Sequence, residues 1–192
     1  MTAVASLSPL SVDRILRVNY AGEYGAVRIY QAQLLVARLA VPDLVPFLEH
    51  TLSHEIRHRD RFRALMGPRS VRVCGALPLW GIGGFALGLL TGILGRSAIL
   101  ACTEAVESVV HRHLDKQLAA LGLDDPEVST TIRDIRIEEL EHLEFAEQGA
   151  APDSIVWRVV QSVVSGSTTL LIWLSTYGEA LVLQSLLRRH TP

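Results

Sequence analysis

The sequence of 192 residues is long enough for one domain that buries a full hydrophobic core. Hydrophobic residues make up 49% and charged residues 20%, which excludes a disordered chain. The net charge of -2, without a long basic block, argues against a nucleic-acid-binding protein. Two cysteines are too few for a disulfide framework or a thiolate metal site.

Apolar residues recur with helical spacing, and no run of alternating β-branched residues predicts a strand, so the sequence predicts an all-α protein. The first 16 residues lack a basic start followed by an apolar run, and we expect no secretory signal there. In chain order, the expected helices span about 11–40, 43–66, 97–121, 125–149 and 153–189. Ser97 and either Asp124 or Asp125 are the expected N-caps of the third and fourth of these helices, and a break is expected near 165–166. Residues 1–192 then form a single domain with a helical core over 11–149.

The segment 73–95 contains 23 residues without a charge, between Arg72 and Arg96. Its length would suit a transmembrane helix, but Pro78 and several glycines interrupt it. A membrane-facing accessory segment is the favoured interpretation; a buried core helix and a spanning helix remain alternatives.

A charged pattern occurs twice along the chain. In each half a lone glutamate precedes a Glu-x-x-His motif by 32 positions, and the second half repeats the first at an offset of 84. The six residues are Glu23, Glu55 and His58, then Glu107, Glu139 and His142. A predicted turn lies at the midpoint of each pair of glutamates. An antiparallel helical hairpin therefore places two carboxylates and one imidazole at the same height.

Four carboxylates packed together repel one another unless cations lie between them. Carboxylate and imidazole donors suit iron or manganese, and a glutamate plus Glu-x-x-His from each hairpin is the ligand pattern of dimetal four-helix bundles. We therefore predict that these six residues bind two metal ions.

Several alternatives stay open. The six residues could be ordinary glutamates and histidines on exposed helix faces. His54 and His58 also fit the H-E-x-x-H signature of zinc proteases, with Glu55 as the base, but that interpretation leaves the second half of the repeat unexplained. Glu104 competes with Glu107 on the same predicted helix face. His50 and His54 are expected to lie around the ligands or on the surface, and His111 is ambiguous.

Five segments resemble the demethoxyubiquinone hydroxylase family of membrane-associated, ferritin-like di-iron monooxygenases. They are 19–26 (NYAGEYGA), 28–30 (RIY), 101–107 (ACTEAVE), 138–142 (EELEH) and 172–175 (IWLS). The resemblance implies a ferritin-like four-helix bundle with one or two apolar accessory helices. It also implies two iron ions on the same six residues, with Glu55 and Glu139 favoured as bridges. A substrate or hydrogen-bonding role is expected for His113.

The activity implied by this resemblance is hydroxylation of a demethoxyubiquinone-type polyprenyl quinol ring by dioxygen and two electrons, from NADH or another reductant. The expected location is the cytoplasmic face of a bacterial cell membrane, as a peripheral protein, with a homo-oligomer or a ubiquinone-biosynthesis protein as possible partners. Tyr20, Ser108, Leu114 and Ile137 depart from the family pattern, which leaves the electron route and the exact quinone open. A rubrerythrin-like peroxidase and a non-catalytic iron-binding protein are the rival functions.

Overall fold

The computed structural model describes residues 11–121, 125–152 and 154–178, and within these ranges the chain is helical, without a strand. The helices are α1 (Val12–Ala40), α2 (Val45–Met66), α3 (Leu77–Leu94), α4 (Arg96–Leu121), α5 (Pro126–Gln148) and α6 (Ile155–Trp173). A short 3-10 turn, η1 (Pro42–Leu44), precedes α2, and a π-turn, η2 (Leu174–Gly178), follows α6. The predicted all-α class is confirmed.

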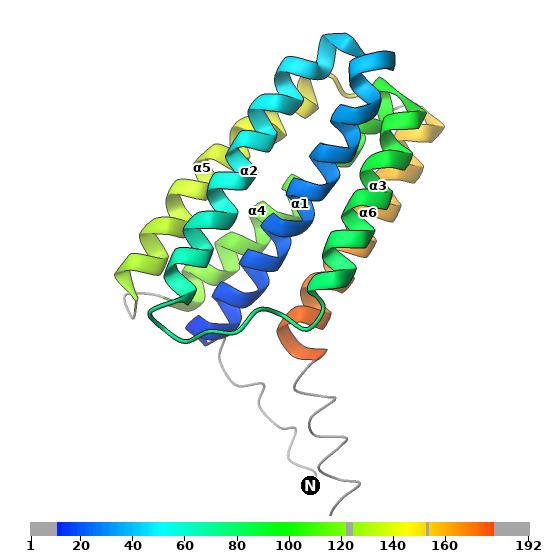
Figure 1. Cartoon of the computed structure of the whole chain (residues 1–192). Helices are drawn as coiled ribbons and strands as arrows, with labels where there is room; N and C mark the ends of the chain where they lie inside the picture. The colour runs from blue at the N-terminus through cyan, green and yellow to red at the C-terminus, as the bar shows by residue number, and fades with distance from the viewer. Residues whose placement is uncertain (1–10, 122–124, 153, 179–192) are drawn as a thin grey trace, which may run out of the picture.

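Two helical hairpins form the bundle (Figure 1): α1 packs on α2, α4 packs on α5, and the hairpins meet around a shared core. The accessory helices α3 and α6 lie on the same side of the bundle, α3 against α1 and α6 against α4. The Trp80 indole N–H of α3 donates to the Ser175 hydroxyl of η2 at 2.9 Å, which ties the ends of these two accessory segments together.

Caps and prolines set most helix ends where the sequence predicts them. The Ser11 side chain accepts from the Arg14 N–H, and Asp125 accepts from the Val128 N–H, so both are N-caps. The prediction for Ser97 is wrong: Gly95, at φ 88°, ends α3, and α4 begins directly at Arg96. The predicted break at 165–166 is also wrong, since α6 runs through it from its cap at Ser154. Asp124 and residues 179–189 of the predicted last helix lie outside the described residues.

Helix α3 contacts α1 through glycines. A Cβ atom on Gly84 would lie 2.5 Å from the Gly25 carbonyl oxygen, and one on Gly88 would lie 2.2 Å from that of Ile29. Both distances are shorter than any real carbon–oxygen contact, so only glycine permits this backbone approach. The larger side chains of α3 therefore lie mostly on its other faces.

The accessory helices expose many large apolar side chains. We call the following set the apolar outer face: Leu79, Ile82, Leu90, Ile93 and Leu94 on α3, and Ile155, Val159, Val163, Leu170 and Trp173 on α6. By length and composition alone, the segments Leu77–Leu94 and Ile155–Thr176 would each be sufficient to cross a membrane. Only 33% of the first and 22% of the second is buried, so neither is a core helix.

Candidate metal centre

The six residues of the sequence repeat lie together in the middle of the bundle. Each is at most 5% exposed, although they come from four helices. Glu23 lies on α1, Glu55 and His58 on α2, Glu107 on α4, and Glu139 and His142 on α5. Glu104 lies outside this group, with its pKa raised by burial and influenced by Gln161 and Glu147 instead.

The six side chains form two overlapping groups of possible metal ligands. One contains Glu23, Glu55, His58 and Glu139, and the other Glu55, Glu107, Glu139 and His142. Within each group the donor atoms lie within 4.8 Å of one another. Glu55 and Glu139 belong to both, so the arrangement has the form of two adjacent cation positions between shared carboxylates.

Both histidines turn Nδ1 toward Glu139. The Nδ1 of His58 is 3.1 Å from one Glu139 oxygen, and the Nδ1 of His142 is 3.1 Å from the other Glu139 oxygen. Among the described residues, the buried Oε1 of Glu55 has no hydrogen-bond partner. Nδ1 of His142 lies 3.5 Å away without forming a hydrogen bond to it. A buried carboxylate oxygen that accepts no hydrogen bond is costly, and a cation would satisfy it. The donor set therefore fits a metal centre.

Burial and the close approach of like charges dominate the electrostatics of the cluster. Burial and the charge of Glu139 raise the pKa of Glu23 to about 7. Burial and neighbouring carboxylates raise the pKa values of Glu55 and Glu107 well above their ordinary range. Burial opposes a charge on Glu139 as well, but hydrogen bonds from His142 and His58 bring its pKa below the ordinary value. Three carboxyl groups are thus held toward the protonated form and one is held ionised.

We predict that the metal-free protein loses stability as pH rises from about 6.5 to 9. A group whose pKa is raised on folding stabilises the fold at low pH, and this contribution is lost as pH rises through the folded pKa. Glu23 starts to lose it near its ordinary pKa of 4.5 and finishes near 7, so only the end of its loss falls in this window, whereas Glu55 and Glu107, whose pKa values are raised well above the ordinary range, continue to lose theirs. Burial lowers the pKa of His58, but the hydrogen bond and charge of Glu139 outweigh burial and raise the pKa from 6.5 to about 9, so His58 loses its contribution across the whole window. For each proton that the folded state binds and the unfolded state does not, the free energy of unfolding falls by about 1.4 kcal/mol per pH unit.

Thermal unfolding of metal-free and metal-loaded protein across this window measures the effect. The expected fall is several degrees for the metal-free protein and much less for the loaded one, because bound cations replace the protons. His54 and His113, whose pKa values burial lowers to about 4, affect stability only below their ordinary value of 6.5. A flat or rising melting temperature in the metal-free protein would contradict the prediction.

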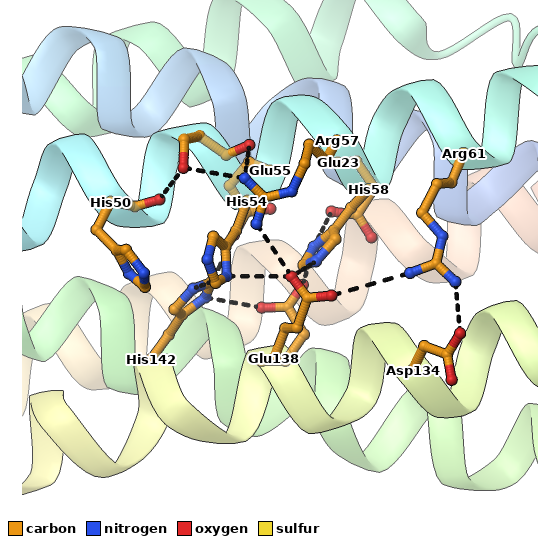
Figure 2. Close-up of polar contacts among 12 residues, drawn as sticks. Glu23, His50, His54, Glu55, Arg57, His58, Arg61, Asp134, Glu138 and His142 are labelled. Atoms are coloured by element: carbon orange, nitrogen blue, oxygen red, sulfur yellow. Dashed lines mark hydrogen bonds and ion pairs between the residues drawn. The ribbon is translucent and has the colours of Figure 1, made fainter.

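Residues outside the repeat hold the cluster in place. The Tyr30 hydroxyl donates to Glu107 at 2.7 Å. The outer Nε2 of His58 lies 3.2 Å from Glu138, and the outer Nε2 of His142 lies 3.3 Å from Nδ1 of His54. Arg57 in turn contacts Glu138 at 3.3 Å (Figure 2). Such outer partners orient imidazole ligands. Sequence reasoning assigned no role to Tyr30 or Glu138; the doublet Glu138-Glu139 was the available signal for the second.

A cavity of about 150 Å³ connects the carboxylates to the accessory helices. Glu23, Glu55, Glu107 and Glu139 form one part of its wall. The opposite wall is apolar and comes mostly from α1, α3, α4 and α6, with Ala26, Trp80, Leu87, Val106, Leu171 and Ile172 among its side chains. Gly22 and Gly25 also line it. The cavity therefore combines a cluster of polar donors with a surface suited to an apolar molecule.

His113 lines the same cavity and is held by the buried amide of Gln117, which is paired in turn with Asn19. Gln117 Nε2 donates to Nε2 of His113 at 2.8 Å, while Gln117 and Asn19 exchange two hydrogen bonds of 2.8 Å. An amide nitrogen can only donate, so the His113 proton lies on Nδ1. Burial lowers the pKa of His113 to about 4, which keeps the ring neutral.

A helical bundle of two hairpins around a buried, duplicated carboxylate–histidine cluster is the arrangement typical of dimetal four-helix-bundle proteins, and this cluster could hold metal ions. Residues 10–175 match the family model of the ubiquinone biosynthesis protein COQ7. The chain belongs to this family.

Named relatives agree with this assignment. The chain is 39% identical over 164 residues to the 3-demethoxyubiquinol 3-hydroxylase of Rhodospirillum rubrum, covering 85% of this chain and 77% of the relative. It is 36% identical over 168 residues to the mitochondrial NADPH-dependent 3-demethoxyubiquinone 3-hydroxylase of Dictyostelium discoideum, covering 86% and 76%. The human protein of the same name is 36% identical over 174 residues, covering 88% and 79%.

Proposed function

We propose that this chain is a di-iron monooxygenase that hydroxylates the ring of a demethoxyubiquinone-type polyprenyl quinol in ubiquinone biosynthesis. The observation that carries the proposal is the cavity that joins four buried carboxylates to an apolar wall. The names of the relatives supply the substrate class and the reaction. One oxygen atom of dioxygen is inserted into a ring C–H bond. The other oxygen atom takes up two electrons and two protons and leaves as water.

The proposed ligands are the six residues of the repeat. Glu23 and His58 would hold one iron, Glu107 and His142 would hold the other, and Glu55 and Glu139 would be available to both, in accord with the two overlapping groups. Oxygen and nitrogen donors without thiolate suit iron. When bound, the iron pair supplies the redox chemistry that activates dioxygen. The chain contributes fixed geometry, a water-poor cavity and a route for an apolar substrate.

The apolar wall gives the substrate its orientation. Each buried methylene of a prenyl tail favours apolar surroundings by about 0.8 kcal/mol, so the tail belongs among the side chains of α3 and α6. The ring then lies next to the carboxylate cluster, where Gly22 and Ala26 leave space on α1. For Gly22, even an added Cβ atom would meet no neighbouring atom within 4 Å.

Product analysis tests the function. Metal-loaded protein is incubated with a short-chain demethoxyubiquinol, isotopically labelled dioxygen and NADH or NADPH, because two relatives are named for NADPH. Mass spectrometry should find a hydroxylated ring with one labelled oxygen atom. Consumption of hydrogen peroxide without any hydroxylated quinol would support a rubrerythrin-like peroxidase instead.

Enlarging Ala26, a buried residue of the cavity wall, is predicted to block the quinol. Ala26→Phe should lower quinol hydroxylation at least about tenfold, since a phenyl group occupies the space of the ring, while peroxide consumption and metal content change little. Ala119→Phe, on an exposed position of α4, is the matched control. Equal loss of both rates would indicate damage to the metal centre, and an unchanged quinol rate would place the substrate elsewhere.

His113 is proposed to donate a hydrogen bond from Nδ1 to an oxygen of the quinol ring. We predict that His113→Phe, which keeps an aromatic ring but removes the donor, lowers kcat/KM for the quinol by about tenfold to hundredfold and leaves metal content intact. Gln117→Glu should move the His113 proton to Nε2, because a carboxylate accepts there, and nitrogen NMR of labelled histidine reports this directly. Wild-type kcat/KM in both variants would rule out the role.

We also propose that the chain is a peripheral protein on the cytoplasmic face of a bacterial membrane, seated by the apolar outer face of α3 and α6. An insoluble prenylated substrate would then pass from lipid into the cavity directly between these helices. We further propose that the same face binds a protein partner, either a second copy of this chain or another ubiquinone-biosynthesis protein.

A further inference from the structure

We propose that His50, His54 and the outer nitrogen of His142 form a second metal site, through which divalent ions are loaded into the buried centre. This inference rests on the proposed dimetal function. The site is distinct from the six proposed ligands, although it shares one imidazole with them.

The three histidines form a ladder from the surface to the cluster (Figure 2). His50 is exposed, His54 is 8% exposed and His142 is 1% exposed. The ring centres of His50 and His54 are 4.2 Å apart, and those of His54 and His142 are 5.1 Å apart. One nitrogen from each ring lies within 4.8 Å of the others, which is close enough for a single ion to bind all three. Imidazole is a good ligand for Fe²⁺, Zn²⁺ and related ions.

A metal ion can reach the buried ligands only along a polar route. The cavity side of the cluster is walled by apolar side chains of α3 and α6, and a hydrated cation crosses such a surface at a high desolvation cost. The opposite side, between α2 and α5, carries the histidine ladder together with Glu138 (Figure 2). The two sides thus offer separate routes, one for an apolar molecule and one for a cation.

A second group of possible ligands lies outside the cluster, next to His58. We call this group and the His50 group the outer groups, and the two groups of the cluster the inner groups. His54, His58 and Glu138 also bring one ligand atom each within 4.8 Å. Each outer group therefore shares one histidine with one inner group, His142 or His58, and His54 belongs to both outer groups. Arg57 and Arg61 contact Glu138 at 3.3 and 3.9 Å, and a cation at this second group would have to displace them. For that reason the His50 group is the better receiving site.

The shared imidazole makes the outer site transient. A neutral imidazole has one free lone pair. Before loading, a proton on Nδ1 of His142 can be donated to Glu139, at 3.1 Å, and Nε2 is free for an incoming ion. If Nδ1 of His142 held an ion of the buried centre, the proton of this ring would have to lie on Nε2, which is 3.3 Å from Nδ1 of His54. His54 would therefore serve as a metal ligand only before transfer, and the same Nδ1 also lies 3.2 Å from an oxygen of Glu138.

Metal loading kinetics test the inference. Metal-free protein is mixed anaerobically with Co²⁺ or Fe²⁺, and the rates of uptake and of chelator-driven release are followed by absorbance. His50→Ala should slow both by about tenfold, in line with the loss of one ligand partner, and leave two ions per chain at the end. Glu49→Ala, exposed on the same turn of α2 and paired with Arg38, should load at the wild-type rate.

The outcomes separate the alternatives. Wild-type loading in His50→Ala would overturn the inference, as would a lower final metal content, because that would make His50 a permanent ligand. A third tightly bound Zn²⁺ on the fully loaded protein, lost in His50→Ala, would also overturn the transfer role. If the wild-type protein never binds two ions, the proposed function itself fails, independently of the loading rates.

Discussion

Replacing Glu139 with alanine is expected to remove both metal ions and all hydroxylation. Glu139 is 1% exposed, belongs to both inner ligand groups and accepts from both histidines. Its loss leaves each position with three donors, and it removes the negative charge that favours protonation of His58 in the metal-free protein. Metal analysis after gel filtration should find well under one ion per chain, with activity at background.

Two further variants make this result specific. Glu107→Ala removes a residue of one group only, so it should abolish activity while retaining more metal than Glu139→Ala. Glu104→Ala, three residues before Glu107 and outside both groups, should keep a nearly normal metal content. The opposite ranking of Glu104 and Glu107 would show that the sequence repeat aligns different residues from those that bind metal.

The second large effect concerns the apolar outer face. Ile82, Leu90 and Ile93 of α3 are 74%, 60% and 67% exposed. Burying each in the boundary of a lipid bilayer is worth about 2 kcal/mol, and three aspartates there add a desolvation cost. The triple aspartate variant is therefore expected to bind vesicles that contain anionic phospholipid at least about 100-fold more weakly, as measured by co-sedimentation.

The matched control places three aspartates at exposed apolar positions elsewhere, Leu35, Leu39 and Ile137, on α1 and α5. This variant should sediment with vesicles like the wild type. Both variants should retain their metal, which distinguishes release from unfolding. Equal vesicle binding by both variants would show that the apolar outer face does not contact lipid.

The sequence was sufficient to predict the helical class because proline, glycine and capping residues mark most helix ends. The prediction of helix ends failed where two local signals compete. Ser97 is a good N-cap residue, but Gly95 adopts a positive φ of 88° and turns the chain directly into α4, so Ser97 lies inside the helix. The pair Ser165-Gly166 suggested a break, yet Ser167 and Thr169 donate to carbonyls of their own helix and α6 continues.

The duplicated spacing also predicted which six side chains come together, since equal distances from a turn fix equal heights in a hairpin. The spacing contains no information on neighbours across hairpins. Glu138 meets His58 across 80 positions, and Asn19 meets Gln117 across 98. These contacts depend on how α1 and α2 pack on α4 and α5, which no local pattern in one sequence specifies.

The glycine contact between α1 and α3 reverses the usual rule for mutational tolerance. In most helices the inward face accepts apolar residues of several sizes, and the outward face must stay polar. On α3 the inward positions Gly84 and Gly88 leave no room for a single methyl group. The outward positions carry Leu and Ile and would accept many apolar residues of similar size. In a library of α3 variants selected for a folded protein, we expect these two glycines to stay unchanged. The exposed positions of α3 should accept many different apolar residues.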